Sequence, residues 1–157
     1  MDLILWRHAE AFDPEPGQPD MDRALTPKGL KQAKKMAEWL TSQLPEGCRI
    51  LVSPALRTVQ TAEALGRKFK IVPDIATEAD PDAVLHAANW PNAREPVLVV
   101  GHQPTLGQVA ALLLCGQPQY WEIKKCNAWW FVQRDPADPD DLYLKAVMSP
   151  SLLMSKA

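Results

Sequence analysis

Short apolar runs alternate along the chain with longer segments whose apolar positions recur at helical spacing. The runs predict strands at residues 3–6, 49–52, 71–72 and 97–100. The helical spacing predicts helices over residues 27–44, 54–69, 83–90 and 104–115. Two further apolar runs, 128–133 and 142–147, enclose an acidic turn and predict a hairpin. This succession predicts an α/β fold, a three-layer sandwich with a mostly parallel sheet.

Three of the predicted strands are followed by polar side chains of the types that act in catalysis or ligand binding. Arg7 and His8 follow the first, Ser53 with Arg57 just beyond follows the second, and His102 follows the run at 97–100. The carboxyl ends of parallel strands meet at one edge of a sheet, where ligands bind in open α/β folds. An arginine fork matches the oxygens of a phosphoryl group, and a neutral histidine can be a nucleophile. The sequence therefore predicts a site that holds a phosphoryl group over His8.

Other side chains are expected to have structural rather than catalytic roles. The lysines on the helix expected over 27–44 are interpreted as a solvated face. Cys115 lies in an apolar run and is expected in the core. The tryptophans are expected in the core or at its rim, and Trp6 and Trp90 are candidates for the edge of the site. Leu152, Leu153 and Met154 are expected to pack back on the domain.

Composition narrows the classes of protein that the chain can be. A length of 157 residues predicts a single domain over 1–157, and a net charge of −2 with mixed signs argues against a nucleic-acid or membrane surface. Three widely spaced cysteines predict no disulfide framework, and three histidines without paired ligand spacing predict no metal site. Only Met1 and Asp2 precede the first strand, so we expect no leader peptide and a soluble, cytoplasmic monomer.

The polar motifs, taken in order, resemble those of the histidine phosphatase superfamily. They are Arg7-His8-Ala9-Glu10-Ala11, then Asp22-Arg23-Ala24-Leu25-Thr26 with Gly29, Ser53-Pro54-Ala55-Leu56-Arg57 continuing to Gln60-Thr61, Gly101-His102, and Met148-Ser149-Pro150. An Arg-His pair alone is a weak signal, but the ordered set is specific. The resemblance spans residues 3 to about 154 and is strongest to the SixA-type phosphohistidine phosphatases. It implies a phosphoglycerate mutase-like fold.

The resemblance also assigns roles to individual residues. It implies that His8 is the nucleophile that carries the phosphoryl group, that Arg7 and Arg57 clamp the phosphoryl oxygens, and that His102 completes the pocket. Arg23 is a further candidate for phosphate binding. The family needs no metal or other cofactor, which agrees with the demands of phosphoryl transfer, since arginines supply the positive charge. The second ring nitrogen of His8 is expected to donate to a fixed acceptor.

Departures from the family pattern narrow the expected substrate. Ala9 and Ala11 stand where larger members commonly have Gly and then Ser or Thr, which favours the SixA branch over the mutases. The chain is too short for the large helical insert, so we expect an open site that suits a phosphorylated protein. Glu10 and Glu78 are both candidates for the general acid. The main hypothesis is hydrolysis of protein phosphohistidine; the alternatives are a small-molecule phosphomonoesterase acting on a small phosphate ester and a non-catalytic phosphate-binding module.

Overall fold

The computed structural model describes residues 1–154 and contains a six-stranded mixed sheet. Its strands are β1 (Asp2–Arg7), β2 (Arg49–Val52), β3 (Lys70–Ile71), β4 (Val97–Gly101), β5 (Ala128–Val132) and β6 (Tyr143–Met148). They are ordered β3-β2-β4-β1-β5-β6; the first four are parallel, and β5 is antiparallel to both of its neighbours. The mostly parallel sheet and the hairpin expected from the sequence are confirmed.

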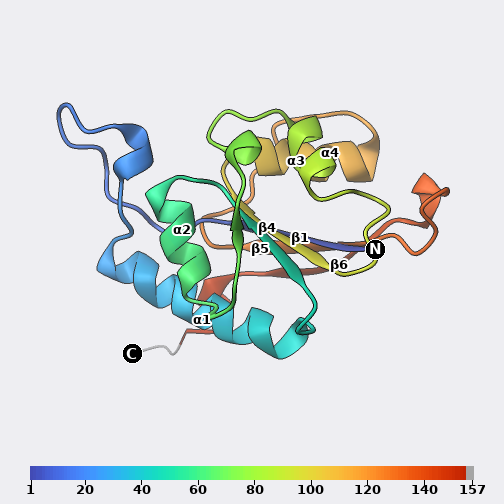
Figure 1. The fold of residues 1–157 in the computed structure, drawn as a ribbon, viewed down its shortest axis with the longest axis horizontal. Helices are drawn as coiled ribbons and strands as arrows, with labels where there is room; N and C mark the ends of the chain where they lie inside the picture. The colour runs from blue at the N-terminus through green and yellow to red at the C-terminus, as the bar shows by residue number, and fades with distance from the viewer. Residues whose placement is uncertain (155–157) are drawn as a thin grey trace.

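Helices cover both faces of this sheet (Figure 1). One face is covered by α1 (Pro27–Gln43) and α2 (Leu56–Glu63), the other by α3 (Pro81–Ala87) and α4 (Thr105–Cys115). Short 3-10 turns lie in the connections: η1 (Asp20–Asp22), η2 (Pro73–Ile75), η3 (Pro139–Asp141) and η4 (Pro150–Leu152). The architecture is the expected three-layer sandwich without a large helical insert.

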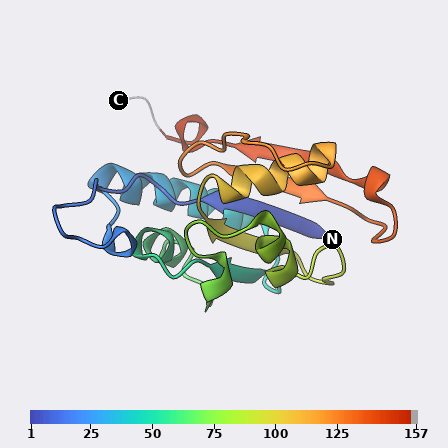
Figure 2. The same ribbon diagram turned by 90° about the horizontal axis from the view of Figure 1, so that it is seen from above.

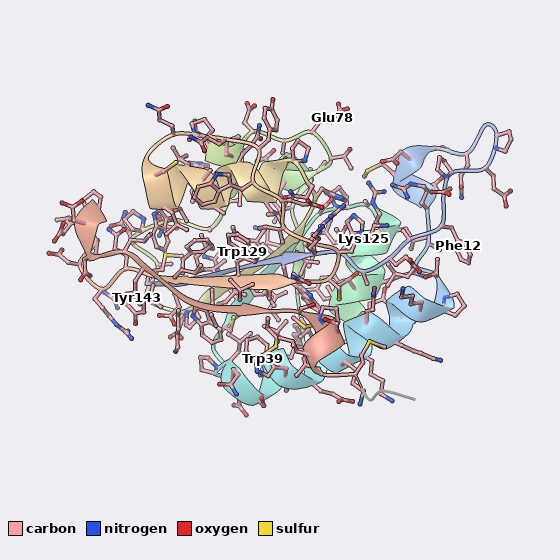
Figure 3. The ribbon with its side chains drawn as sticks, turned by 180° about the vertical axis from the view of Figure 1, so that it is seen from behind. Phe12, Trp39, Glu78, Lys125, Trp129 and Tyr143 are labelled. Atoms are coloured by element: carbon pink, nitrogen blue, oxygen red, sulfur yellow. The ribbon has the colours of Figure 1, made fainter. Side chains whose placement is uncertain are left out.

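The alternation of side chains along β1 builds both halves of the core. Ile4 and Trp6 pack against the α1 side, whereas Leu3 and Leu5 pack against the α3 and α4 side. All four side chains are fully buried. Trp39 of α1 and Trp129 of β5 lie on opposite faces of the same sheet (Figure 3). The central strand is thus clamped on both faces, which fixes the position of the residues that follow it.

The helix expected over 54–69 is shorter than the sequence suggests. Its observed form, α2, ends at Glu63, and the chain then turns at Gly66 with a φ of +64°, a conformation that favours glycine. Cys115 was expected in the core but is exposed, because it is the last residue of α4 and extends past the core. Of the tail, Leu153 packs on the core, whereas Leu152 is exposed.

Neither candidate tryptophan borders the site. The Trp6 side chain is fully buried and its indole N–H donates to the Cys126 carbonyl at 2.9 Å. Trp90 packs against the core on the α3 and α4 side. Both tryptophans were expected at the edge of the site, and both expectations are wrong. The alternation of side chains along β1 turns Trp6 into the core, and the loop that carries Trp90 leads to the amino end of β4, away from the carboxyl ends that form the site.

The segment between β1 and α1 extends beyond the body of the molecule at the carboxyl end of β1 (Figure 2). A bridge between Ala11 and Leu25 closes its base, and η1 lies within it. Across residues 1–154, no helix combines the length and apolar character needed to cross a membrane.

Candidate active site

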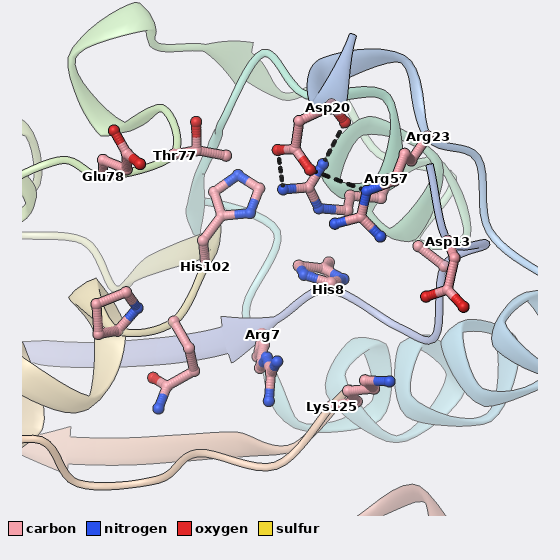
Figure 4. Close-up of a pocket in the computed structure, with 13 residues that line it drawn as sticks. Arg7, His8, Asp13, Asp20, Arg23, Arg57, Thr77, Glu78, His102 and Lys125 are labelled. Carbon is pink, nitrogen blue, oxygen red and sulfur yellow. Dashed lines mark hydrogen bonds and ion pairs between the residues drawn. The ribbon is translucent and has the colours of Figure 1, made fainter. Parts of the chain in front are cut away.

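The carboxyl ends of β1, β2 and β4 meet around a cavity of about 420 Å³ (Figure 4). The structure brings together Arg7, His8, Arg57 and His102 in its lining, as the sequence predicts for their positions. Arg23 joins them from the segment before α1, and Lys125 joins them from the segment before β5. Acidic residues in the lining are Asp13, Asp20 and Glu78. The cavity thus has four cationic side chains against three carboxylates.

The backbone around His8 is fixed by hydrogen bonds from three directions. The His8 N–H donates to the Gly101 carbonyl at 3.1 Å, and the His8 carbonyl accepts from the Cys126 N–H at 3.0 Å. The next residue, Ala9, donates its N–H to the Thr61 hydroxyl at 3.1 Å. The nucleophile candidate is therefore held by β4, by α2 and by the segment before β5, so little of its geometry depends on a mobile loop.

The His8 ring has a defined hydrogen-bonding tautomer. Its Nδ1 lies 2.7 Å from the Ala9 carbonyl oxygen, and because a carbonyl only accepts, Nδ1 carries the hydrogen. Nε2 is then the nitrogen with a lone pair. Burial first, and then the nearby His102 and arginines, lower the pKa of His8 to about 3, although the hydrogen bond to Ala9 acts in the opposite direction. His8 is therefore neutral at neutral pH, with Nε2 able to attack an electrophile.

His102 lies beside His8 and is oriented by Ser53. The two imidazole centroids are 5.4 Å apart, and His102 Nε2 lies 2.7 Å from the Ser53 hydroxyl. The Ser53 oxygen accepts from the Ala55 N–H, and among the described residues the Ser53 hydroxyl hydrogen has no acceptor other than His102 Nε2, so we assign the hydroxyl as the donor to Nε2. Nδ1 of His102 then carries the hydrogen and is a donor. Burial lowers the pKa of His102 to about 4, so this ring is also neutral.

Arg57 is buried in the first turn of α2 and is held by Asp20. Its Nη2 lies 2.9 Å from the Asp20 carboxylate, and its Nη1 donates to the Asp20 carbonyl at 2.8 Å. Arg23 donates from Nε to the same carboxylate at 2.9 Å and from Nη1 to the Phe12 carbonyl. Partial burial alone would raise the pKa of Asp20, but hydrogen bonds from the two arginines lower it. Asp20 is therefore an anion that positions two cations.

Donors without a partner gather at the cavity. Among the described residues, three buried side-chain nitrogens have no hydrogen-bond partner: Arg7 Nε, Arg57 Nε and His102 Nδ1. Buried polar groups are nearly always satisfied, so three such groups in one cavity need an explanation. In Figure 4, Arg7 and Arg57 lie on opposite sides of the His8 ring. This arrangement fits a tetrahedral oxyanion placed over His8.

The two candidate general acids have different positions. Glu78 lines the cavity from the loop before α3, beyond His102 in Figure 4. Glu10 is not among the lining residues; its carboxylate accepts from the Thr26 hydroxyl at 2.7 Å, at the start of α1. The structure therefore brings Glu78, but not Glu10, to the histidines.

Asp20 and Lys125 were missed by sequence reasoning. Asp20 lies in a proline-rich segment with one usable signal, its position three residues before Arg23, which is close enough for an ion pair. Lys125 carries no such signal. Its segment is held beside the cavity by tertiary hydrogen bonds, among them those from the Cys126 N–H to the His8 carbonyl and from the Trp6 indole to the Cys126 carbonyl.

Comparisons with known proteins identify relatives of this chain. The family model described as histidine phosphatase superfamily (branch 1) matches residues 3–82. Phosphohistidine phosphatase SixA of Escherichia coli is 32% identical over 127 residues, which cover 74% of this chain and 76% of that protein. An uncharacterized protein of Picosynechococcus is 36% identical over 81% of this chain and 82% of its own length. The structure of the protein histidine phosphatase SixA complexed with tungstate matches with a TM-score of 0.77 and 26% identity, over 98% of this chain and 100% of that one.

Proposed function

Since the chain belongs to the histidine phosphatase superfamily, we propose that it hydrolyses phosphohistidine on a protein partner, with His8 as the residue that carries the phosphoryl group. The observation that supports this most is the free Nε2 of a neutral His8, which lies between Arg7 and Arg57. Relatedness to the SixA-type enzymes, expected from the sequence, is confirmed by the match to Escherichia coli SixA.

The reaction takes two displacements at phosphorus. In the first, the Nε2 lone pair of His8 attacks the phosphorus, the P–N bond of the substrate breaks, and the substrate imidazole keeps the electron pair and takes a proton from solvent water. In the second, water attacks the phosphorus of phospho-His8, the P–Nε2 bond breaks with its electron pair returning to Nε2, and inorganic phosphate leaves with the oxygen of that water, whose proton passes to solvent. Arg7, Arg57 and the Nδ1 hydrogen of His102 stabilise the equatorial oxygens in both steps. Arg23 and Lys125 add to the positive charge.

The positive charge in this mechanism comes from the chain itself. Burial lowers the pKa of Arg7 and of Arg57, yet a guanidinium remains protonated in proteins. Arginines are not metal ligands, so the donor set is suited to an oxyanion rather than to a cation. We therefore propose that no metal ion or other cofactor takes part, and that activity persists after exhaustive chelation. An activity that is lost on chelation and restored only by Zn²⁺ or Mg²⁺ contradicts this.

A protein phosphohistidine and a small phosphate ester differ in their leaving group, and this difference predicts which of them reacts faster. An imidazole leaves more readily than an alkoxide, which needs a strong general acid. Glu78 is the candidate acid in the lining, and Glu10 is held by Thr26. We expect a kcat/KM for a phosphohistidine protein at least about tenfold above that for an alkyl phosphate, a preference of roughly 1.4 kcal/mol.

Competition between the two substrates on one enzyme preparation tests this proposal. Glu78→Gln should slow the alkyl phosphate more than the phosphohistidine substrate, because only the former depends on the acid. Glu10→Gln is the matched control, a second carboxyl outside the cavity. If a small phosphate ester is the better substrate, the chain is a small-molecule phosphomonoesterase instead. If nothing is turned over while phosphate still binds, it is a binding module.

A further inference from the structure

A second cavity, of about 510 Å³, adjoins the first and shares Arg7 and Lys125 with it. It lies between the start of α1, the segment 122–127 before β5 and the segment 149–154 after β6. Its charged lining comprises four cations and one carboxylate: Arg7, Lys28, Lys124, Lys125 and Glu122. The carboxylate of Glu122 lies 3.1 Å from Lys124 Nζ and also acts electrostatically on Arg7, so among the described residues Lys28 and Lys125 have no acid of their own in the lining.

Two of these lysines are available to a ligand. Lys28 and Lys125 are exposed, and within residues 1–154 neither forms an ion pair with a carboxylate. Lys125 lies on the Arg7 side of His8 (Figure 4) and at the same end of the sheet as Phe12 (Figure 3). Arg7 itself is anchored, since its Nη1 donates to the Ile123 carbonyl at 3.0 Å. A positive surface therefore continues from the phosphoryl site into the second cavity.

The position of Lys28 argues against a purely structural role. Thr26 caps α1 and Pro27 is its first residue, so Lys28 lies in the first turn. The N–H groups there give the helix start a partial positive charge, and a cation at this position is unfavourable for the helix. The first turn of α1 itself contains no acidic residue, and the Glu10 carboxylate at the helix start is bonded to the Thr26 hydroxyl rather than to Lys28. A lysine at this point adds to a field that attracts anions.

From this we infer that the second cavity binds a carboxylate side chain of the phosphorylated protein, from a Glu or Asp within a few residues of the phosphohistidine. The inference rests on the proposed function. A polypeptide carries its carboxylates at a fixed spacing from the phosphohistidine, at most about 3.3–3.6 Å of chain per residue, so it can span two adjoining cavities at once. Besides the lysines, the cavity is lined by Ser149 and Ser151, whose hydroxyls lie 3.0 Å apart, and by Met154, whose apolar side chain can contact the methylene groups of the ligand.

Synthetic phosphohistidine peptides that differ only in the residues flanking the phosphohistidine test this inference. We expect the kcat/KM for Glu-flanked peptides to exceed that for Gln-flanked peptides by about tenfold at low ionic strength, mainly through KM. Added salt should reduce the ratio. The variant Lys28→Gln should bring the ratio below about threefold, while its turnover of free phosphohistidine stays within about twofold of wild type, since that substrate has no flanks to bind.

Lys34→Gln is the matched control, since it removes the same charge from the same helix outside this cavity. It should retain the full Glu preference. Equal rates for Glu-flanked and Gln-flanked peptides overturn the inference while leaving the proposed function standing. If Lys28→Gln weakens only the turnover of a small organic bisphosphate, the cavity takes a second phosphate and the inference is again wrong. Failure to turn over any phosphohistidine substrate refutes the proposed function and this inference together.

Discussion

The two buried histidines make the stability of the fold depend on pH in a calculable way. His8 and His102 have pKa values of about 3 and about 4 in the folded protein. In the unfolded chain a histidine takes a proton near pH 6.5. Between these limits the unfolded state binds more protons than the folded state, so the free energy of unfolding falls as the pH falls. The contribution is fully present above about pH 6.5 and is lost toward the folded pKa of each residue.

The size of the effect follows from the depth of burial. His8 is 7% exposed and His102 is 3% exposed, so solvent screens neither group appreciably. Lowering the pH from 7 to 5 should then cost roughly 2 kcal/mol for each histidine, or about 4 kcal/mol together. This window lies above the range in which most carboxylates titrate.

Urea unfolding at pH 7, 6 and 5, followed by tryptophan fluorescence at constant ionic strength, measures this loss. His102→Asn should halve the change in unfolding free energy between pH 7 and pH 5, whatever its effect at pH 7. His86→Gln removes an exposed histidine of α3 and should leave the change as in wild type. An unfolding free energy that is the same at pH 7 and pH 5, or a loss that His102→Asn leaves intact, refutes the neutral, buried pair.

Two further substitutions test the positioning of the site. Ser53→Ala removes the hydroxyl that orients His102 and should lower kcat by about tenfold. Nitrogen NMR of the His102 ring should show a changed tautomer in this variant. An unchanged ring spectrum would contradict the assigned hydrogen bond. Gly107→Ala would place a Cβ 1.7 Å from the Trp121 carbonyl oxygen. We therefore expect the free energy of unfolding, measured by urea titration, to fall by about 3 kcal/mol. An unchanged free energy would refute the close packing of α4 on the segment that contains Trp121.

The strands and the residues that follow them could be predicted because a parallel sheet leaves few ways to arrange its strands. Four apolar segments must pair as parallel strands, and the residues after β1, β2 and β4 then meet at one edge. Arg7, His8 and His102 follow directly from this rule. Arg57 follows from it too, since the helix start lies only a few residues past β2.

The loops could not be predicted, because tertiary contacts rather than local pattern position them. Asp20 reaches the cavity through its bonds to Arg57, a residue 37 positions away. Lys125 reaches it through the bond between Cys126 and His8. Cys115 was misplaced for a related reason: an apolar composition does not show where a helix extends past its core.

The measurement that tests the central claim most directly is trapping of the phosphoryl group on the enzyme. Wild type is mixed with a substrate labelled on phosphorus and quenched within milliseconds without acid, since a P–N bond to histidine does not survive acid. The label should appear on the protein, map to His8, and be absent from a folded His8→Ala variant. Label retained by His8→Ala, or label on another residue of wild type, would contradict the assignment of His8 as the nucleophile.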